Sequence, residues 1–219
     1  MERTVHVNCD DIFPFCELMP ITDTCIVVYM WHLYRKMQEK MLLKDFKLVD
    51  PVPVEYVPSK NQNIDFIQEQ LNKRASYLSS RLIGTSTGQL VVVPCNIGFH
   101  WILTILNVEK EIVYLLDPLR HRIHDQDWKY VVNMALTLYN AEAGRKGKKQ
   151  PTWEVVKAPR QPDAKQCGFY IMRYMKDIIE NFGVGDKESL PSMFTNLKYS
   201  LVEINEVRSE WAECMLDYI

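Results

Sequence analysis

The stretch 158–182, APRQPDAKQCGFYIMRYMKDIIENF, carries a cysteine at the point where a proline-containing loop passes into an apolar helix. Cys167 is followed by Gly168, whose missing side chain would let a substrate backbone approach closely. A free thiol has a pKa of about 8.5 and is mostly protonated at neutral pH, but a helix N-terminus and an imidazolium neighbour lower that pKa. The stretch therefore predicts a helix that begins near Cys167, with this thiol as a candidate nucleophile.

Two upstream segments contain the side chains that such a thiol needs. GFHWIL places His100 inside a predicted strand, and YLLDPLR places Asp117 directly after the next apolar strand. A carboxylate behind an imidazole selects its tautomer and stabilises its charge. A side-chain amide near the cysteine can donate to the oxyanion of a tetrahedral intermediate, and Gln161 and Gln166 are the local candidates.

Each of these residues also fits a structural role. A cysteine at a helix start is often a small buried side chain, a strand histidine is often a hydrogen-bonded core residue, and an aspartate before proline is often a turn residue. Their combination places nucleophilic catalysis on an equal footing with three unrelated structural roles.

The arrangement resembles the ubiquitin-like-protein-specific cysteine proteases, the SENP or ULP family. The chain has His-Trp in a strand, an aspartate 17 residues later, and Gln-x5-Cys-Gly whose cysteine lies 50 residues after the aspartate. The order His, Asp, Cys also agrees with that family, and the resemblance covers roughly residues 12–182. It implies an α+β, papain-like fold with a small central mixed sheet flanked by helices and the nucleophile at a helix N-terminus.

The resemblance also implies roles for individual residues. Cys167 would be the nucleophile, His100 the general base and acid, Asp117 the orienting carboxylate and Gln161 the oxyanion donor. Gln166 stands where the family usually has Asp or Glu, so it receives no such role.

Substrate recognition is implied in the same way. Trp101 would line the narrow channel for a substrate's Gly-Gly tail, with core packing as the alternative, and Gly168 would let the substrate backbone approach. Pro20 stands where family members usually carry the tryptophan of the opposite wall. This departure predicts either a wider channel or another aromatic side chain in that place.

The implied activity is that of an isopeptidase or endopeptidase that cleaves after the C-terminal Gly-Gly of a ubiquitin-like modifier, with SUMO as the first choice, and without cofactor or metal. The sequence of these segments is most similar to plant, transposon-related members of that family. Two rivals remain: an idle protein-binding module of the same fold, and an acyltransferase that uses the same three residue types.

The rest of the chain predicts one α+β domain over 1–219, with a core of about 12–182 and a helical tail over 186–219. Residues 1–20 read as irregular because of Pro14 and Pro20. We expect helices over 25–41, 64–83 and 127–143 and strands over 89–95, 100–108, 111–118 and 152–159. In the tail, Leu197, Leu201 and Ile204 suggest one more amphipathic helix.

Composition limits the alternatives. The 219 residues are 47% hydrophobic, which indicates a globular chain, and the net charge of −2 argues against a nucleic-acid binder. The six cysteines form no CxxC pair, so we expect reduced thiols in the nucleus or cytoplasm. No apolar stretch reaches the length of a membrane span, and we expect a monomer. His121 and His124 form an HxxH pair without a second ligand set, and the basic stretch 145–149 reads as a solvated loop.

Overall fold

The computed structural model describes residues 5–54, 63–119, 126–182 and 187–216. Its centre is a five-stranded mixed sheet with the strands in sequence order. The strands are β1 (Phe46–Leu48), β2 (Leu90–Asn96), β3 (Trp101–Asn107), β4 (Ile112–Leu116) and β5 (Thr152–Val155). The three central strands form an antiparallel meander, whereas β1 pairs with β2, and β5 with β4, in parallel.

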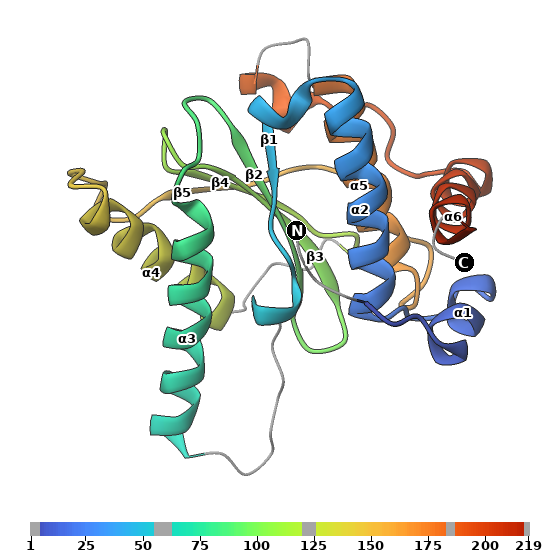
Figure 1. The fold of residues 1–219 in the computed structure, drawn as a ribbon, viewed down its shortest axis with the longest axis horizontal. Helices are drawn as coiled ribbons and strands as arrows, with labels where there is room; N and C mark the ends of the chain where they lie inside the picture. Colours follow the sequence, from blue (N-terminus) through green and yellow to red (C-terminus); the bar gives the residue numbers. More distant parts are fainter. Residues whose placement is uncertain (1–4, 55–62, 120–125, 183–186, 217–219) are drawn as a thin grey trace.

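Helices cover both faces of this sheet (Figure 1). They are α1 (Cys9–Cys16), α2 (Asp23–Glu39), α3 (Ile64–Leu82), α4 (Gln126–Glu142), α5 (Cys167–Phe182) and α6 (Leu201–Leu216), with short 3-10 helices at Leu42–Lys44, Val52–Val54 and Lys187–Ser192. The pair α3 and α4 lies on one face, and α2 and α5 lie on the other with α6 outside them. The expected α+β, papain-like class is confirmed.

The apolar runs of the central strands follow from this layering. Successive side chains of a strand point to opposite faces. Leu103 and Ile105 of β3 therefore join the core under α2 and α5, whereas Ile102 and Leu106 join the core under α3 and α4. A sheet covered on both faces needs apolar residues at nearly every strand position, which is why these strands lack a polar alternation.

The N-terminal segment differs from expectation. Residues 9–16 form α1 despite Pro14, which lies inside the helix. Asn8 caps this helix through its side chain, which accepts from the backbone N–H of Asp10 at 2.8 Å, while Asp11 accepts from the N–H of Asn8 at 3.0 Å. This reciprocal cap satisfies free donors of the first turn and stabilises a helix that the proline alone argues against.

The tail does contain a helix, and Ile204 lies on its buried face as expected, but the two leucines do not. Leu197 precedes α6, and Leu201 is 61% exposed. The residues that face the core are Ile204, Val207, Trp211 and Cys214. These four residues follow one another at spacings of 3, 4 and 3, as on one face of a helix. The buried face therefore lies C-terminal to Leu197 and Leu201.

A buried cation holds α6 against α5 and α2. The side chain of Lys176 on α5 is 6% exposed, and its Nζ donates to Glu210 Oε1 at 2.5 Å and to Glu180 Oε1 at 3.2 Å. Tyr29 Oη donates to the other oxygen of Glu210 at 2.7 Å. A buried charge is tolerated only when it is paired and hydrogen-bonded in this way.

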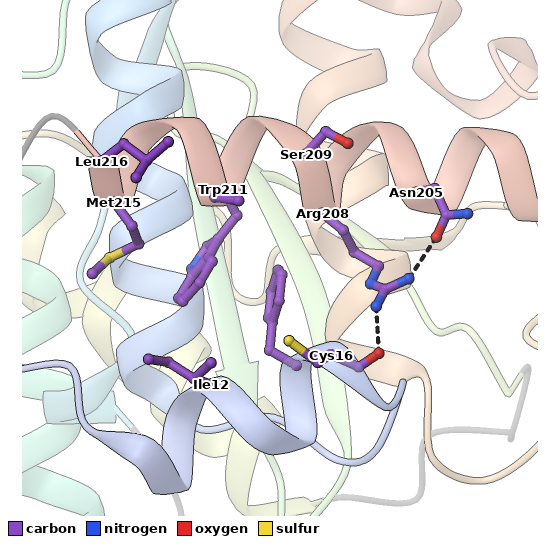
Figure 2. A pocket seen from close by; sticks show the side chains of 10 residues that line it. Ile12, Cys16, Asn205, Arg208, Ser209, Trp211, Met215 and Leu216 are labelled. Carbon is purple, nitrogen blue, oxygen red and sulfur yellow. Dashed lines mark hydrogen bonds between the residues drawn. The ribbon is translucent and has the colours of Figure 1, made fainter.

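A groove of about 590 Å³ separates α1 from α6 (Figure 2). Phe15 and Trp211 stack at a centroid distance of 4.1 Å beside it. Arg208 crosses the groove and donates to Asn205 Oδ1 at 2.6 Å and to the carbonyl oxygen of Cys16. Among the described residues, no helix is both long and apolar enough to cross a membrane.

Candidate active site

His100 lies immediately before β3, not inside a strand as predicted. It closes a two-residue turn between β2 and β3, in which Ile97 N donates to His100 O at 2.8 Å. Both turn residues have positive φ, 74° at Gly98 and 70° at Phe99, a backbone that joins antiparallel strands tightly. The histidine therefore stands at one end of the sheet, where its side chain can face a reaction partner.

Asp117 reaches the same end of the sheet from β4. Strand β3 begins just after His100 and runs antiparallel to β4, so the start of β3 lies beside the end of β4, with Leu103 opposite Leu116. His100 Nε2 and Asp117 Oδ1 are 2.7 Å apart. The N–H of Leu119 donates to the same carboxylate oxygen at 2.9 Å, which holds the Asp117 side chain, 2% exposed, in place.

Cys167 is the first residue of α5, as predicted, and α5 packs on β3. Burial by itself would lower the pKa of His100, but hydrogen bonds to Asp117 and Cys167 and the charges of those two groups outweigh it and raise the pKa to about 9. Since Nε2 faces Asp117, Nδ1 is the ring nitrogen left for the thiol. The cysteine thus has both a helix N-terminus and an imidazolium that can stabilise a thiolate.

The loop before α5 brings Gln161 to this end of the sheet. Its backbone N–H donates to Pro118 O at 3.0 Å, one residue after Asp117. Its side-chain Nε2 donates to the carbonyl oxygen of Asp163, which leaves the second amide hydrogen for another acceptor. The amide of Gln166 is instead held by Asp163 Oδ2 at 2.8 Å.

Asp163 is a residue that the motif search overlooked. Its carboxylate accepts from the backbone N–H groups of Lys165, at 2.7 Å, and Gln166, at 3.2 Å. It therefore shapes the turn that delivers Cys167 to the helix start. An aspartate after a proline and a few residues before a helix is the sequence signal that could have revealed it.

Trp101 and Gly168 are brought together, and Ile21 is close to both. Trp101 is 2% exposed, and its Nε1 donates to Ile21 O at 3.1 Å. A Cβ placed on Gly168 would lie 2.4 Å from Ile21 Cγ1 and 3.4 Å from Trp101 Cδ1. Close packing against Ile21 is thus one reason for a glycine after Cys167, alongside the expected approach of a substrate.

The weaker motifs add no further site. Among the residues that the structure describes, no group of three His, Cys, Asp or Glu side chains is placed to hold a metal ion. The HxxH pair, His121 and His124, lies outside the described residues. The basic stretch 145–149 is exposed throughout.

A cysteine at a helix N-terminus, packed against a sheet whose end carries a hydrogen-bonded histidine and aspartate, is the arrangement of papain-like cysteine proteases. A family model described as the Ulp1 protease family, C-terminal catalytic domain, matches residues 85–207, more than half of the chain. The protein therefore belongs to the Ulp1 cysteine protease family. No curated protein sequence matches the chain.

Solved structures agree with this fold at low sequence identity. A de-sumoylating protease aligns with a TM-score of 0.69 at 14% identity, over 99% of this chain and 89% of the other. The Ulp1 protease domain in complex with Smt3, the yeast ortholog of SUMO, aligns with a TM-score of 0.60 at 14% identity, over 99% and 86%. The Xanthomonas campestris effector XopD bound to ubiquitin aligns with a TM-score of 0.58 at 14% identity, over 97% and 95%.

Proposed function

We propose that the protein is a thiol isopeptidase that cleaves after the C-terminal Gly-Gly of a ubiquitin-like modifier. The observation that carries the proposal is the hydrogen-bonded series Asp117–His100–Cys167 at the N-terminus of α5, with Gln161 on the adjoining loop. Membership of the Ulp1 family supports the same reaction class.

The residues divide the chemistry as follows. His100 takes the thiol proton, and the Cys167 sulfur attacks the carbonyl carbon of the terminal glycine. The oxyanion accepts from Gln161 Nε2 and from the backbone N–H of Cys167. His100 then protonates the leaving lysine amine, and a water molecule, deprotonated by the same imidazole, hydrolyses the thioester and frees the thiol. Asp117 keeps the imidazole oriented and stabilises its positive charge throughout.

SUMO is the first choice of modifier, because the similar solved structures include a de-sumoylating protease and the Ulp1 domain in complex with Smt3. Ubiquitin is the second choice, because XopD was solved bound to ubiquitin. We expect one copy of the chain to act on the modifier's protein conjugates. The reaction needs a reduced thiol, so the nucleus or cytoplasm is the proposed location. The grouping with plant, transposon-related members rests only on the similarity of short sequence segments and stays a prediction.

Electrophilic modifier probes test the proposal directly. SUMO and ubiquitin that carry a reactive group in place of the terminal carboxylate should form a covalent adduct at Cys167, identified by peptide mass spectrometry. Cys167→Ala should abolish the adduct, whereas Cys16→Ala, which removes an exposed thiol elsewhere, should not. Labelling that survives Cys167→Ala would overturn the assignment of the nucleophile.

Pro20 favours a second candidate, a binding module that keeps the fold without turnover, because the expected second aromatic wall is absent at that position. Such a module would bind unmodified SUMO or ubiquitin, measured by isothermal titration, yet form no adduct with either probe.

A further inference from the structure

Strand β5 lies at one edge of the sheet and presents backbone groups to the outside. In the described part of the chain, β4 is the only strand beside it. Thr152 N donates to Glu111 O at 2.9 Å, and in a parallel pair such bonding recurs at every second residue of the strand. The N–H and C=O groups of Trp153 and Val155 therefore point away from β4.

The side chains of β5 are also more exposed than those of the other four strands. Val155 is 71% exposed, and Thr152 is exposed as well. Trp153 lies on the α4 face of the sheet, where its Nε1 donates to Asn133 Oδ1 at 3.0 Å. Because alternate residues of a strand share a face, Val155 presents its apolar side chain on that face, and Glu154 points to the opposite one.

The basic stretch 145–149 leads into this edge and is anchored beside it. Its side chains are exposed, as expected for a solvated loop, but its backbone is held. Glu111, which is 6% exposed, accepts from the N–H of Lys148 and from Asn140 Nδ2. A Cβ on Gly147 would lie 2.1 Å from Asn140 Nδ2, so a glycine is needed for this close approach. A buried carboxylate thus fixes the basic residues at the beginning of β5.

Positive charge lies at both ends of the open edge, although the chain as a whole has a net charge of −2. The exposed cations are Arg145, Lys146, Lys148 and Lys149 before β5 and Lys157 after it. Within the described residues, no carboxylate forms an ion pair with any of them. Lysines on an edge strand itself discourage pairing with another chain. Here the lysines flank the strand, so they favour a partner strand with negatively charged ends.

We propose that the β5 edge docks an extended segment of a partner protein, with β-branched residues at its centre and acidic residues at both ends. The segment would add a sixth strand through main-chain hydrogen bonds to Trp153 and Val155. Its acidic ends would lie against Lys149 and Lys157. A nucleic acid could match the charges but has no peptide backbone to pair with the strand. The proposal does not depend on catalysis by Cys167.

Fluorescence anisotropy with a labelled nine-residue peptide, Asp-Asp-Val-Thr-Val-Thr-Val-Asp-Asp, tests the proposal on the intact chain. We expect saturable binding, at least about tenfold tighter than binding of the same peptide with lysine in place of each aspartate. Two further peptides carry backbone N-methyl groups at all odd or at all even positions. Because alternate N–H groups of a strand face opposite edges, one of these peptides should bind like the parent and the other should lose binding. Equal affinities of the two would overturn strand addition.

Variants of the protein locate the binding surface. Lys149→Glu/Lys157→Glu should weaken binding of the parent peptide at least about tenfold. Lys44→Glu/Lys73→Glu, which makes the same change in net charge at exposed positions elsewhere, should leave the affinity within about a factor of two. Val155→Pro removes an outward N–H that β4 does not use, so it should abolish binding while the protein remains folded by circular dichroism.

Three results would overturn the proposal. If the parent peptide shows no saturable binding, the lysines only shield the edge from other strands. If the two double variants lose affinity equally, binding does not occur at β5. If an oligothymidylate of ten nucleotides displaces the peptide at an equal concentration, the surface reads negative charge alone and not a peptide backbone.

Discussion

Asp117 Oδ1 lies 2.7 Å from His100 Nε2, although 17 residues and two strands separate the two positions along the chain. The antiparallel pairing of β3 with β4 brings them together at one end of the sheet. The same carboxylate oxygen accepts from the N–H of Leu119, so Asp117 is held by its own loop before it meets the imidazole.

Asp117→Asn should therefore leave the fold intact and reduce turnover. The asparagine oxygen can still accept from Leu119, but the amide has no charge to stabilise the imidazolium and can select the wrong tautomer. We expect kcat for a modifier–aminomethylcoumarin substrate to fall by about 10²- to 10⁴-fold while the protein remains folded. Turnover within a factor of about two of the wild type would contradict the role of Asp117.

The pKa of His100 predicts the alkaline limb of the activity profile. Hydrogen bonds to Asp117 and Cys167 overcome burial and raise the pKa from 6.5 to about 9, so the imidazolium persists through neutral pH. Turnover should fall as pH rises through about 9, because neutral His100 neither stabilises a thiolate nor protonates the leaving amine. The measurement is kcat/KM between pH 6 and 10, and Asp117→Asn should move this limb to lower pH.

The same raised pKa predicts that the folded protein loses stability as the pH rises, whereas a carboxylate with a lowered pKa loses stability as the pH falls. A pKa raised in the folded state stabilises the fold fully below the unfolded value of 6.5, and that contribution is lost as pH rises through about 9. Urea denaturation at pH 6, 8 and 10 should therefore show a smaller alkaline loss for His100→Ala than for the wild type. Parallel curves for the two proteins would contradict the shift.

Gly168→Ala should destabilise the protein, although alanine normally favours a helix over glycine. The added Cβ would lie 2.4 Å from Ile21 Cγ1, a distance that forces one of the two elements to move. We expect a loss of about 1–3 kcal/mol in the free energy of unfolding, measured by urea denaturation. The double variant Gly168→Ala/Ile21→Ala should be less destabilised than the sum of the two single variants; simple additivity would show that the contact is not the cause.

Lys176→Met should be costly because it strands three carboxylates, on Glu180, Glu206 and Glu210. Removing one partner of a buried charge network typically costs about 3–5 kcal/mol of unfolding free energy. Lys73→Met is the matched control, since Lys73 pairs with Glu69 at the same i,i+4 spacing but is 63% exposed. The control should lose less than about 0.5 kcal/mol. Equal losses in the two variants would contradict a buried network.

Local patterns were sufficient for much of the fold. Within the helix expected over 25–41, Ile26, Met30, Leu33 and Met37 recur at spacings of 4, 3 and 4, and all four are buried in α2. The apolar runs around Val92, Ile105 and Leu115 predicted the central strands. Both patterns repeat within a few residues, so they can be recognised without knowing which other segments the helix or strand packs against.

The sequence patterns gave wrong predictions where a cap or a tertiary contact outweighed the local preference of a residue. Pro14 argued against α1, but the cap formed by Asn8 and Asp11 stabilises it. The leucines at 197 and 201 suggested a core face for α6, but Trp211 and Cys214 are the residues that reach α2.

The features of the candidate site likewise fall into those set by the sequence and those set by the tertiary structure. The sequence by itself determined the residue types and their order, His100, Asp117, Gln161 and Cys167, because chemistry restricts which side chains can act together. Only the tertiary structure decided that His100 sits in a turn, that Gly168 must accommodate Ile21, and that Phe99 stays exposed beside the base. Those features depend on strand pairing and helix packing between segments far apart in the chain, and no periodicity of the sequence records such contacts.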